Sequence, residues 1–512
     1  MKLNRLHRIG IVFVLLAGLV AVAAPAATQS EECLRVAGVE AGGELLNLDP
    51  INQPNTQNSI MVGVVYNRLM DLDSDFVPHP ELAESWESNE DATVWTFHLR
   101  DDVTFHSGKP FTAADVVYTY QRLIDPESGS EAAATLAFLN PDGIVAVDDH
   151  TVEFRLDAPV VELPVLITTK NTWIVPEGAD GDTLRLTPDG TGPYIPVDFD
   201  PAVEPYRFDQ NPNYWEEGLP IMPCVEFVAI QEATTMSAAL LSGEIDLAQQ
   251  VDFSIIPALQ GNPDVNLIPT GPATSMVLAM WVDTPPFDDV RVRQALKMVV
   301  DRQQIVDTVL LGFGVIGDDN PIPPTSPFAW RSEVPPRDVE GAMALLEEAG
   351  YGPDNPLQVD LYMSEYIPGA TALGQLYAQQ AAEAGIEVNV IVGPASDHWD
   401  NVWLKFPFVG SGWLARPPGE ALAIAYRSNA QYPETHWFRE DYDALLDAAN
   451  TEPDPETRAG LYRQAAQMLT EEGGAIIPVF QQIVAGVRAE CEGYQPHVQL
   501  SRVDVRRVSC ER

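Results

Sequence analysis

The residues best suited to contact a ligand lie in one run, 408–418, which reads FVGSGWLARPP. Arg416 carries a planar fork of N–H donors that suits a carboxylate, sulfate or phosphate, and it accepts no hydrogen bond. Trp413 offers a flat apolar wall of the kind that receives sugar rings or side chains, and Ser411 stands two residues before it. The run predicts a site for an anionic or polyhydroxylated ligand. The alternative is that Arg416 turns outward or pairs with Glu420.

Five further residues are weaker candidates for the same site. Asn429, His436 and Trp437 belong to a polar and aromatic loop that follows a predicted helix at 421–427. Each is equally well explained as a residue that packs the loop. Tyr66 and Glu40 come from the other half of the chain.

The spacings of known catalytic, metal and cofactor motifs are absent or incomplete. The chain has no HExxH and no GxSxG, and its eight His are scattered. Residues 71–75 begin like a calcium loop, but Phe76 stands where that loop needs Gly, so a hairpin turn is expected. Residues 312–317 spell GxGxxG but follow a predicted helix, so a loop is expected. We therefore expect no metal, no cofactor and no catalytic residue, and an exported hydrolase is the remote alternative.

The charge balance excludes several partners. The 512 residues include 75 acidic and 29 basic side chains, a net charge of −46. Such a chain repels nucleic acid and anionic lipid headgroups. Its length is enough for two or more domains.

The first 27 residues are typical of a signal peptide. Lys2, Arg5 and Arg8 precede an apolar run, and the small residues 24–27 offer a cleavage site. Cys33 lacks the small apolar residues that a lipidation site needs before it. No later stretch is long and apolar enough to span a bilayer. An exported, soluble, unlipidated protein is expected.

Export places the four cysteines in an oxidising compartment, where an even number favours disulfide bonds. Cys491 and Cys510 bracket a short C-terminal segment, so we favour that pair together with Cys33 and Cys224. The other two pairings and free buried thiols remain alternatives.

Alternating and helical patterns predict the elements that position these residues. Residues 94–99 alternate as in a half-buried strand, and 112–125 form a helix that begins with a capping box. A helix is expected at 59–70 and a strand hairpin at 143–156. Residues 357–392 read strand, helix, strand with short joints, which is typical of a βαβ crossover and parallel strands.

Several runs of the sequence resemble motifs of the family 5 solute-binding proteins of bacterial ABC importers, the group of the dipeptide- and oligopeptide-binding proteins. They are WTFHLR (95–100), VTFHSGKP (103–110), FTAADVV (111–117), GTGPY (190–194) and GEIDL (243–247). The resemblance implies an α/β fold of two lobes, the type II periplasmic-binding-protein fold with the extra subdomain of the peptide-binding group and mixed sheets flanked by helices.

The resemblance also implies a domain layout and a function. Lobe I would comprise residues 33–270 and 485–512, with an inserted subdomain at about 60–185, and lobe II residues 271–484. A periplasmic monomer would trap a peptide-like or other small polar ligand between the lobes and deliver it to a membrane permease. Peptide-binding relatives carry an Asp for the ligand's α-ammonium where this chain has Arg416. Oligosaccharide, opine or metal-chelate ligands are therefore alternatives.

Overall fold

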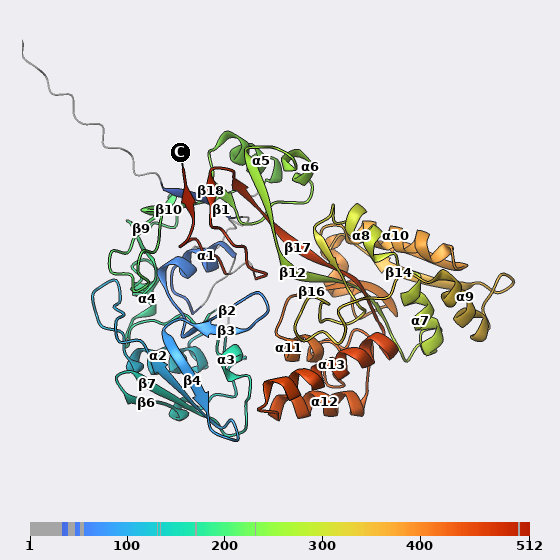
Figure 1. Cartoon of the computed structure of the whole chain (residues 1–512), viewed down its shortest axis with the longest axis horizontal. Coiled ribbons are helices and arrows are strands. Elements are labelled where there is room, and N and C mark those ends of the chain that lie inside the picture. The colour runs from blue at the N-terminus through green and yellow to red at the C-terminus, as the bar shows by residue number, and fades with distance from the viewer. Residues whose placement is uncertain are drawn as a thin grey trace, which may run out of the picture.

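The structure is a computed structural model, and it describes residues 33–38, 47–51, 56–130, 132–133, 135–168, 171–230, 232–499 and 502–511. The predicted signal peptide at 1–27 and the candidate Glu40 lie outside the described residues. The described elements form two bodies joined by a long pair of strands (Figure 1). We call the body that holds the N-terminal elements lobe I and the other lobe II.

One mixed sheet of 11 strands runs through both lobes, in the order β15-β14-β16-β12-β17-β11-β1-β10-β9-β8 with β13 beside β17. Its strands are β1 (Leu34–Gly38), β8 (Tyr194–Pro196), β9 (Tyr206–Gln210), β10 (Cys224–Ala229), β11 (Leu247–Ala248), β12 (Val265–Met280), β13 (Gly314–Ile316), β14 (Leu357–Met363), β15 (Ile386–Val392), β16 (Phe408–Leu414) and β17 (Ala475–Arg488).

The connection between the lobes is the antiparallel pair β12 and β17, which crosses the centre of the molecule (Figure 1). Their register runs from Val265 opposite Arg488 to Ala279 opposite Ala475, with two irregularities between Pro269 and Thr274 and a third between Met276 and Leu278. At this irregular point Thr270 accepts a hydrogen bond at Oγ1 from the Ile483 amide, at 3.0 Å. Each crossing strand is a single continuous strand through the junction.

Lobe I adds a four-stranded sheet to its share of the large sheet. This sheet has the order β4-β5-β7-β6 and is covered by α2. The strands and helices are β2 (Met70–Leu72), β3 (Pro78–Pro80), β4 (Ala83–Ser88), β5 (Val94–Leu99), β6 (Ile144–Asp148), β7 (Thr151–Arg155), β18 (Cys491–Glu492), β19 (Ser509–Cys510), α1 (Thr56–Val65), α2 (Ala113–Ile124), α3 (Leu163–Leu166), α4 (Gly181–Leu184), α5 (Ala233–Ser242) and α6 (Ile256–Leu259).

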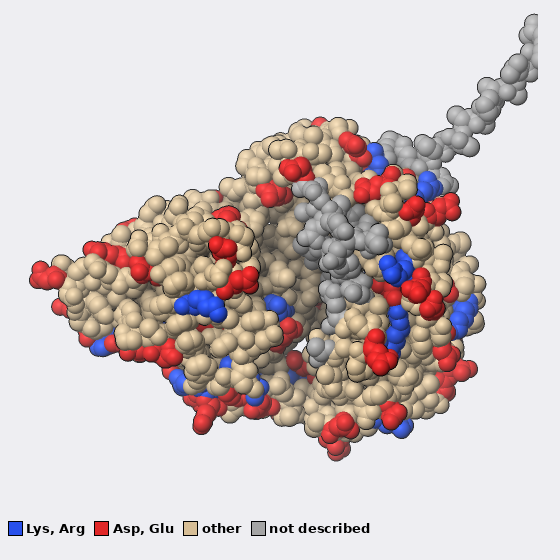
Figure 2. All heavy atoms as spheres, turned by 180° about the vertical axis from the view of Figure 1, so that it is seen from behind, with Lys and Arg blue, Asp and Glu red and all other residues tan. Residues whose placement is uncertain are grey.

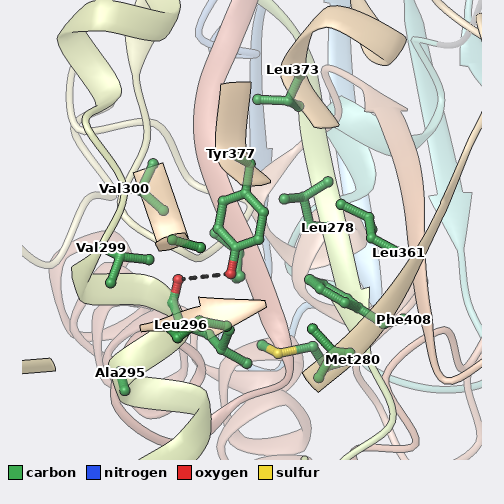
Figure 3. Close-up of a cluster of buried hydrophobic side chains, with 14 of the residues drawn as sticks. Leu278, Met280, Ala295, Leu296, Val299, Val300, Leu361, Leu373, Tyr377 and Phe408 are labelled. Carbon is green, nitrogen blue, oxygen red and sulfur yellow. Dashed lines mark hydrogen bonds between the residues drawn. The ribbon is translucent and has the colours of Figure 1, made fainter. Parts of the chain in front are cut away.

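Lobe II packs helices against the other end of the large sheet, and its core is apolar (Figure 3). There Tyr377 is fully buried, and its hydroxyl donates to the Leu296 carbonyl at 3.1 Å. The helices are α7 (Val290–Met298), α8 (Arg302–Thr308), α9 (Val339–Glu348), α10 (Ala370–Ala382), α11 (Pro418–Ala423), α12 (Glu440–Thr451) and α13 (Pro455–Glu472).

Most of the predicted elements are confirmed. β14, α10 and β15 form the predicted crossover unit, with Leu357 opposite Ile386 in a parallel pair. The capping box at Thr112 and Asp115 is present at the start of α2. The hairpin predicted at 143–156 is β6 and β7.

Two element predictions are wrong. The helix expected at 59–70 ends at Val65, because Asn67 and Arg68 bind the Glu81 carboxylate (Asn67 Nδ2 at 2.7 Å, Arg68 N at 2.9 Å) and so turn the chain away from the helix axis. The loop expected at 312–317 contains strand β13, which forms because residues 479–481 of β17 lie beyond its pairing with β11 and leave backbone groups for β13 on that side.

The structure has the two favoured disulfide bonds, Cys33–Cys224 and Cys491–Cys510. The first joins the start of β1 to the start of β10, and the second closes the C-terminal segment. Among the described residues no cysteine is free.

The molecular surface is hollowed between the lobes, and acidic side chains are spread over both of them (Figure 2). In the described part of the chain, no helix combines the length and hydropathy that crossing a membrane requires.

Candidate functional site

A pocket between the lobes brings together the run that contains Trp413 and Arg416 with residues from lobe I. Lobe II contributes the end of β16 and the start of α11, and β12 and β17 contribute Ser275 and Phe480 from below. Across the gap lies the tip of the β2–β3 hairpin, residues 74–76. The pocket therefore has a wall from each lobe and a floor from the crossing strands.

The lobe I wall is the tight turn that the sequence predicted in place of a calcium loop. Asp73 holds the turn, since its Oδ1 accepts from the amides of Asp75 and Val77, both at 2.9 Å. Phe76 has a φ of 61°, which is rare for a bulky side chain. The described residues contain no group of three or more His, Cys, Asp or Glu arranged to hold a metal ion.

Arg416 both lines the pocket and makes the local contact that was its alternative explanation. Its Nε donates to Glu420 Oε1 at 2.9 Å and its Nη1 to the Leu414 carbonyl at 2.9 Å. The guanidinium carbon lies 5.3 Å from the centre of the Trp413 ring. Within the described part of the chain Nη2 has no hydrogen-bond partner, so it is available to an anion in the pocket.

Trp413 is fixed from behind by a buried carboxylate that the sequence did not reveal. Glu434 is fully buried; its Oε1 accepts from Trp413 Nε1 at 2.9 Å and its Oε2 from Trp403 Nε1 at 3.0 Å. The Tyr426 hydroxyl lies 3.4 Å from Oε1. Burial raises the pKa of Glu434, and these donors oppose the rise. The carboxylate thus sets the orientation of the ring that forms the pocket wall.

We expect Glu434→Gln to loosen this wall. A Gln side chain has one acceptor oxygen, and its NH₂ group would face an indole N–H that has lost its acceptor. Leaving a buried donor unsatisfied lowers the free energy of unfolding by about 1–3 kcal/mol. Urea denaturation measures the loss, and tryptophan fluorescence reports the mobility of the indoles.

The matched control for this change is Glu420→Gln, because the Glu420 side chain is 49% exposed. Its removal should change the unfolding free energy by less than about 0.5 kcal/mol. Equal stability of the two variants would contradict the positioning role of Glu434.

The remaining candidates that the structure describes do not line this pocket. Ser411 is fully buried in β16, and its carbonyl accepts from the Tyr366 hydroxyl at 3.0 Å. Asn429 is exposed. His436 stacks on Trp281 with ring centres 4.3 Å apart and binds Asp283 through Nδ1.

Trp437 and Tyr66 are packing residues in this structure. Trp437 is 3% exposed and contacts Tyr442 in the core of lobe II. Tyr66 is fully buried in the core of lobe I, and burial raises the pKa of its hydroxyl. The pocket therefore keeps Trp413 and Arg416 from the predicted set and adds the hairpin tip.

Comparison with known proteins places the chain in a family. The model of the bacterial extracellular solute-binding proteins, family 5 middle region, matches residues 77–433. The chain is 30% identical over 519 residues to the periplasmic oligopeptide-binding protein OppA of Escherichia coli K12, covering 93% of this chain and 92% of that protein. It is 29% identical over 468 residues to heme-binding protein A of Haemophilus influenzae, covering 84% of each.

A solved structure agrees with this match. HbpA2 from Haemophilus parasuis superposes with a TM-score of 0.81 at 25% identity, covering 94% of this chain and 100% of that one. The chain belongs to family 5 of the bacterial extracellular solute-binding proteins. Its two-lobed fold with mixed sheets, predicted from the resemblance, is confirmed. The family is one of binding proteins, not enzymes.

Proposed function

We propose that the chain is the solute-binding component of an ABC importer and takes a peptide-like or other small polar ligand that carries an anionic group. The observation that supports this ligand class is Arg416, whose Nη2 has no hydrogen-bond partner among the described residues and lies in a pocket between two lobes. The names of the relatives, an oligopeptide-binding and a heme-binding protein, support ligands that differ widely in shape. A ligand that contacts both lobes only when they are closed would favour the closed state over the open one.

The cellular setting belongs to the same proposal. Cleavage of residues 1–27 would release the protein into the periplasm, where it would act as a monomer and deliver its ligand to a membrane permease. The net charge of −46 opposes binding to nucleic acid. We place the lobe boundaries inside β12 and β17, near 270 and 484, because these strands hold the irregular crossing point.

A thermal-shift panel tests the ligand class. It compares di- and tripeptides, opines, organic acids and oligosaccharides, and each carboxylate with its own uncharged amide. A ligand at 100 times its Kd stabilises the protein by about 2.7 kcal/mol. We expect carboxylates to raise the melting temperature and their amides to have a much smaller effect, because only the carboxylate complements the guanidinium.

Two results would contradict the proposal. Equal shifts from a carboxylate and its amide would remove Arg416 as the anion-binding group. Recovery of a chemically altered ligand, detected by mass spectrometry after incubation, would indicate a hydrolase.

A further inference from the structure

A second cavity, of about 440 Å³, adjoins the pocket that contains Arg416 and shares lining residues with it. Lobe I contributes β4, β5 and the segment at 161–165, and lobe II contributes Phe328 and the turn before α13. We call this cavity the chamber. Because both lobes line it, its shape depends on how they approach each other.

The chamber walls are apolar. Trp86 and Trp95 form one side, and Phe328 with several prolines forms the other. Trp95 directs its Nε1 away to the Val160 carbonyl at 3.0 Å, so that its ring is the part left for contact. An apolar concave surface favours an apolar occupant.

The charged residues among the described chamber lining offset each other. They are Glu162 of lobe I and Arg458 of lobe II, whose Oε1 and Nε atoms are 3.9 Å apart. The chamber consequently carries no net charge from these walls, in contrast to the Arg416 pocket. The two cavities therefore suit different parts of one molecule.

Phe76 and Pro418 line both cavities, so the boundary between them is shared side-chain surface. Phe76 takes its left-handed backbone conformation at this boundary. Such a conformation is unfavourable for a bulky residue and persists where the surroundings require it. Its position at the tip of the β2–β3 hairpin brings the aromatic ring to the junction.

We propose that the ligand is amphipathic, with its anionic group at Arg416 and an apolar chain or aromatic group in the chamber. This inference rests on the proposed function and adds the second half of the ligand. Each methylene group that enters an apolar site tightens binding by about fourfold. Affinity should thus rise with apolar length until the chamber is full.

An acylglycine series tests the inference, because it keeps one carboxylate and varies only the chain. We expect Kd, measured by isothermal titration calorimetry, to fall about fourfold per methylene from acetylglycine to hexanoylglycine. No dependence on chain length, or no binding of any member, would overturn the inference.

Ser88→Trp fills the chamber from an exposed position at the end of β4. It should weaken the binding of hexanoylglycine at least tenfold and leave the binding of acetylglycine unchanged. The matched control is Ser85→Trp, because residues 85 and 88 project from opposite faces of the same strand and Ser85 does not line the chamber. Equal effects of the two variants would overturn the inference.

Arg416→Gln separates this inference from the proposed function. This variant should lower the affinity for every acylglycine by the same factor, whatever the chain length. If Arg416→Gln weakens binding but chain length has no effect, the proposed function stands and the chamber has no ligand. If the chain matters and Arg416→Gln does not, the anion site is elsewhere.

Discussion

Replacing Arg416 by Glu should weaken the binding of an anionic ligand by more than a hundredfold. A hydrogen bond to a charged group contributes about 1.5–3 kcal/mol, and a factor of ten in Kd corresponds to about 1.4 kcal/mol. Arg416→Gln, which removes the guanidinium and its positive charge without adding a negative one, should therefore weaken binding about ten- to a hundredfold. The carboxylate of Arg416→Glu adds repulsion in a pocket that excludes part of the solvent.

Both variants should lose less than about 1 kcal/mol of stability, with the larger loss for Arg416→Glu because it places a second carboxylate beside Glu420. Arg416 pairs with Glu420 at a spacing of four residues in a partly exposed position, and such pairs contribute about 0.3–0.5 kcal/mol. Arg291→Gln is the control for a generic loss of positive charge, because Arg291 pairs with Asp289 at the start of α7. Equal ligand affinity of the Arg416 and Arg291 variants would refute the role of Arg416.

Loss of the Cys33–Cys224 bond should be the largest single effect on stability. The bond links residues 191 positions apart, and the other disulfide links residues 19 apart. In the chain-entropy model the stabilisation grows with the logarithm of loop length, so the longer loop is worth about 2 kcal/mol more. It also links the start of β1 to the start of β10. The parallel pairing of these two strands begins one residue later, with Leu34 opposite Val225.

Paired Cys→Ala variants of each disulfide, compared by urea denaturation, measure this difference. Removing Cys33–Cys224 should lower the free energy of unfolding by about 2–5 kcal/mol. Removing Cys491–Cys510 should lower it less, and the order of the two losses is the informative result. A larger loss at the C-terminal pair would show that native packing, not loop closure, decides the contribution.

Local sequence was sufficient where neighbours in the chain decide the structure. The βαβ unit at 357–392 and the capping box at Thr112 follow from periodicity and from a contact over three residues. The helix expected through residue 70 failed because Asn67 also bonds Thr191, a partner 124 residues away. Tertiary contacts of this kind override local propensity.

The candidate site shows the same division between local and distant information. Trp413 and Arg416 were predicted because they stand in one recognisable run. Phe76 was not predicted as a site residue, because more than 300 residues of sequence separate it from the pocket wall that it faces. Glu434 lies in a loop without periodic pattern, and only the convergence of two indole N–H groups on its carboxylate reveals its role.

The crossing strands also determine how the protein comes apart. β12 and β17 pair with each other across the junction, and β17 also pairs with β11 in lobe I and with β13 in lobe II. When one lobe unfolds, a strand that also belongs to the other lobe loses backbone hydrogen bonds. We therefore expect the two lobes to melt in one transition, even though each has a hydrophobic core of its own, and two separate calorimetric transitions would contradict this expectation.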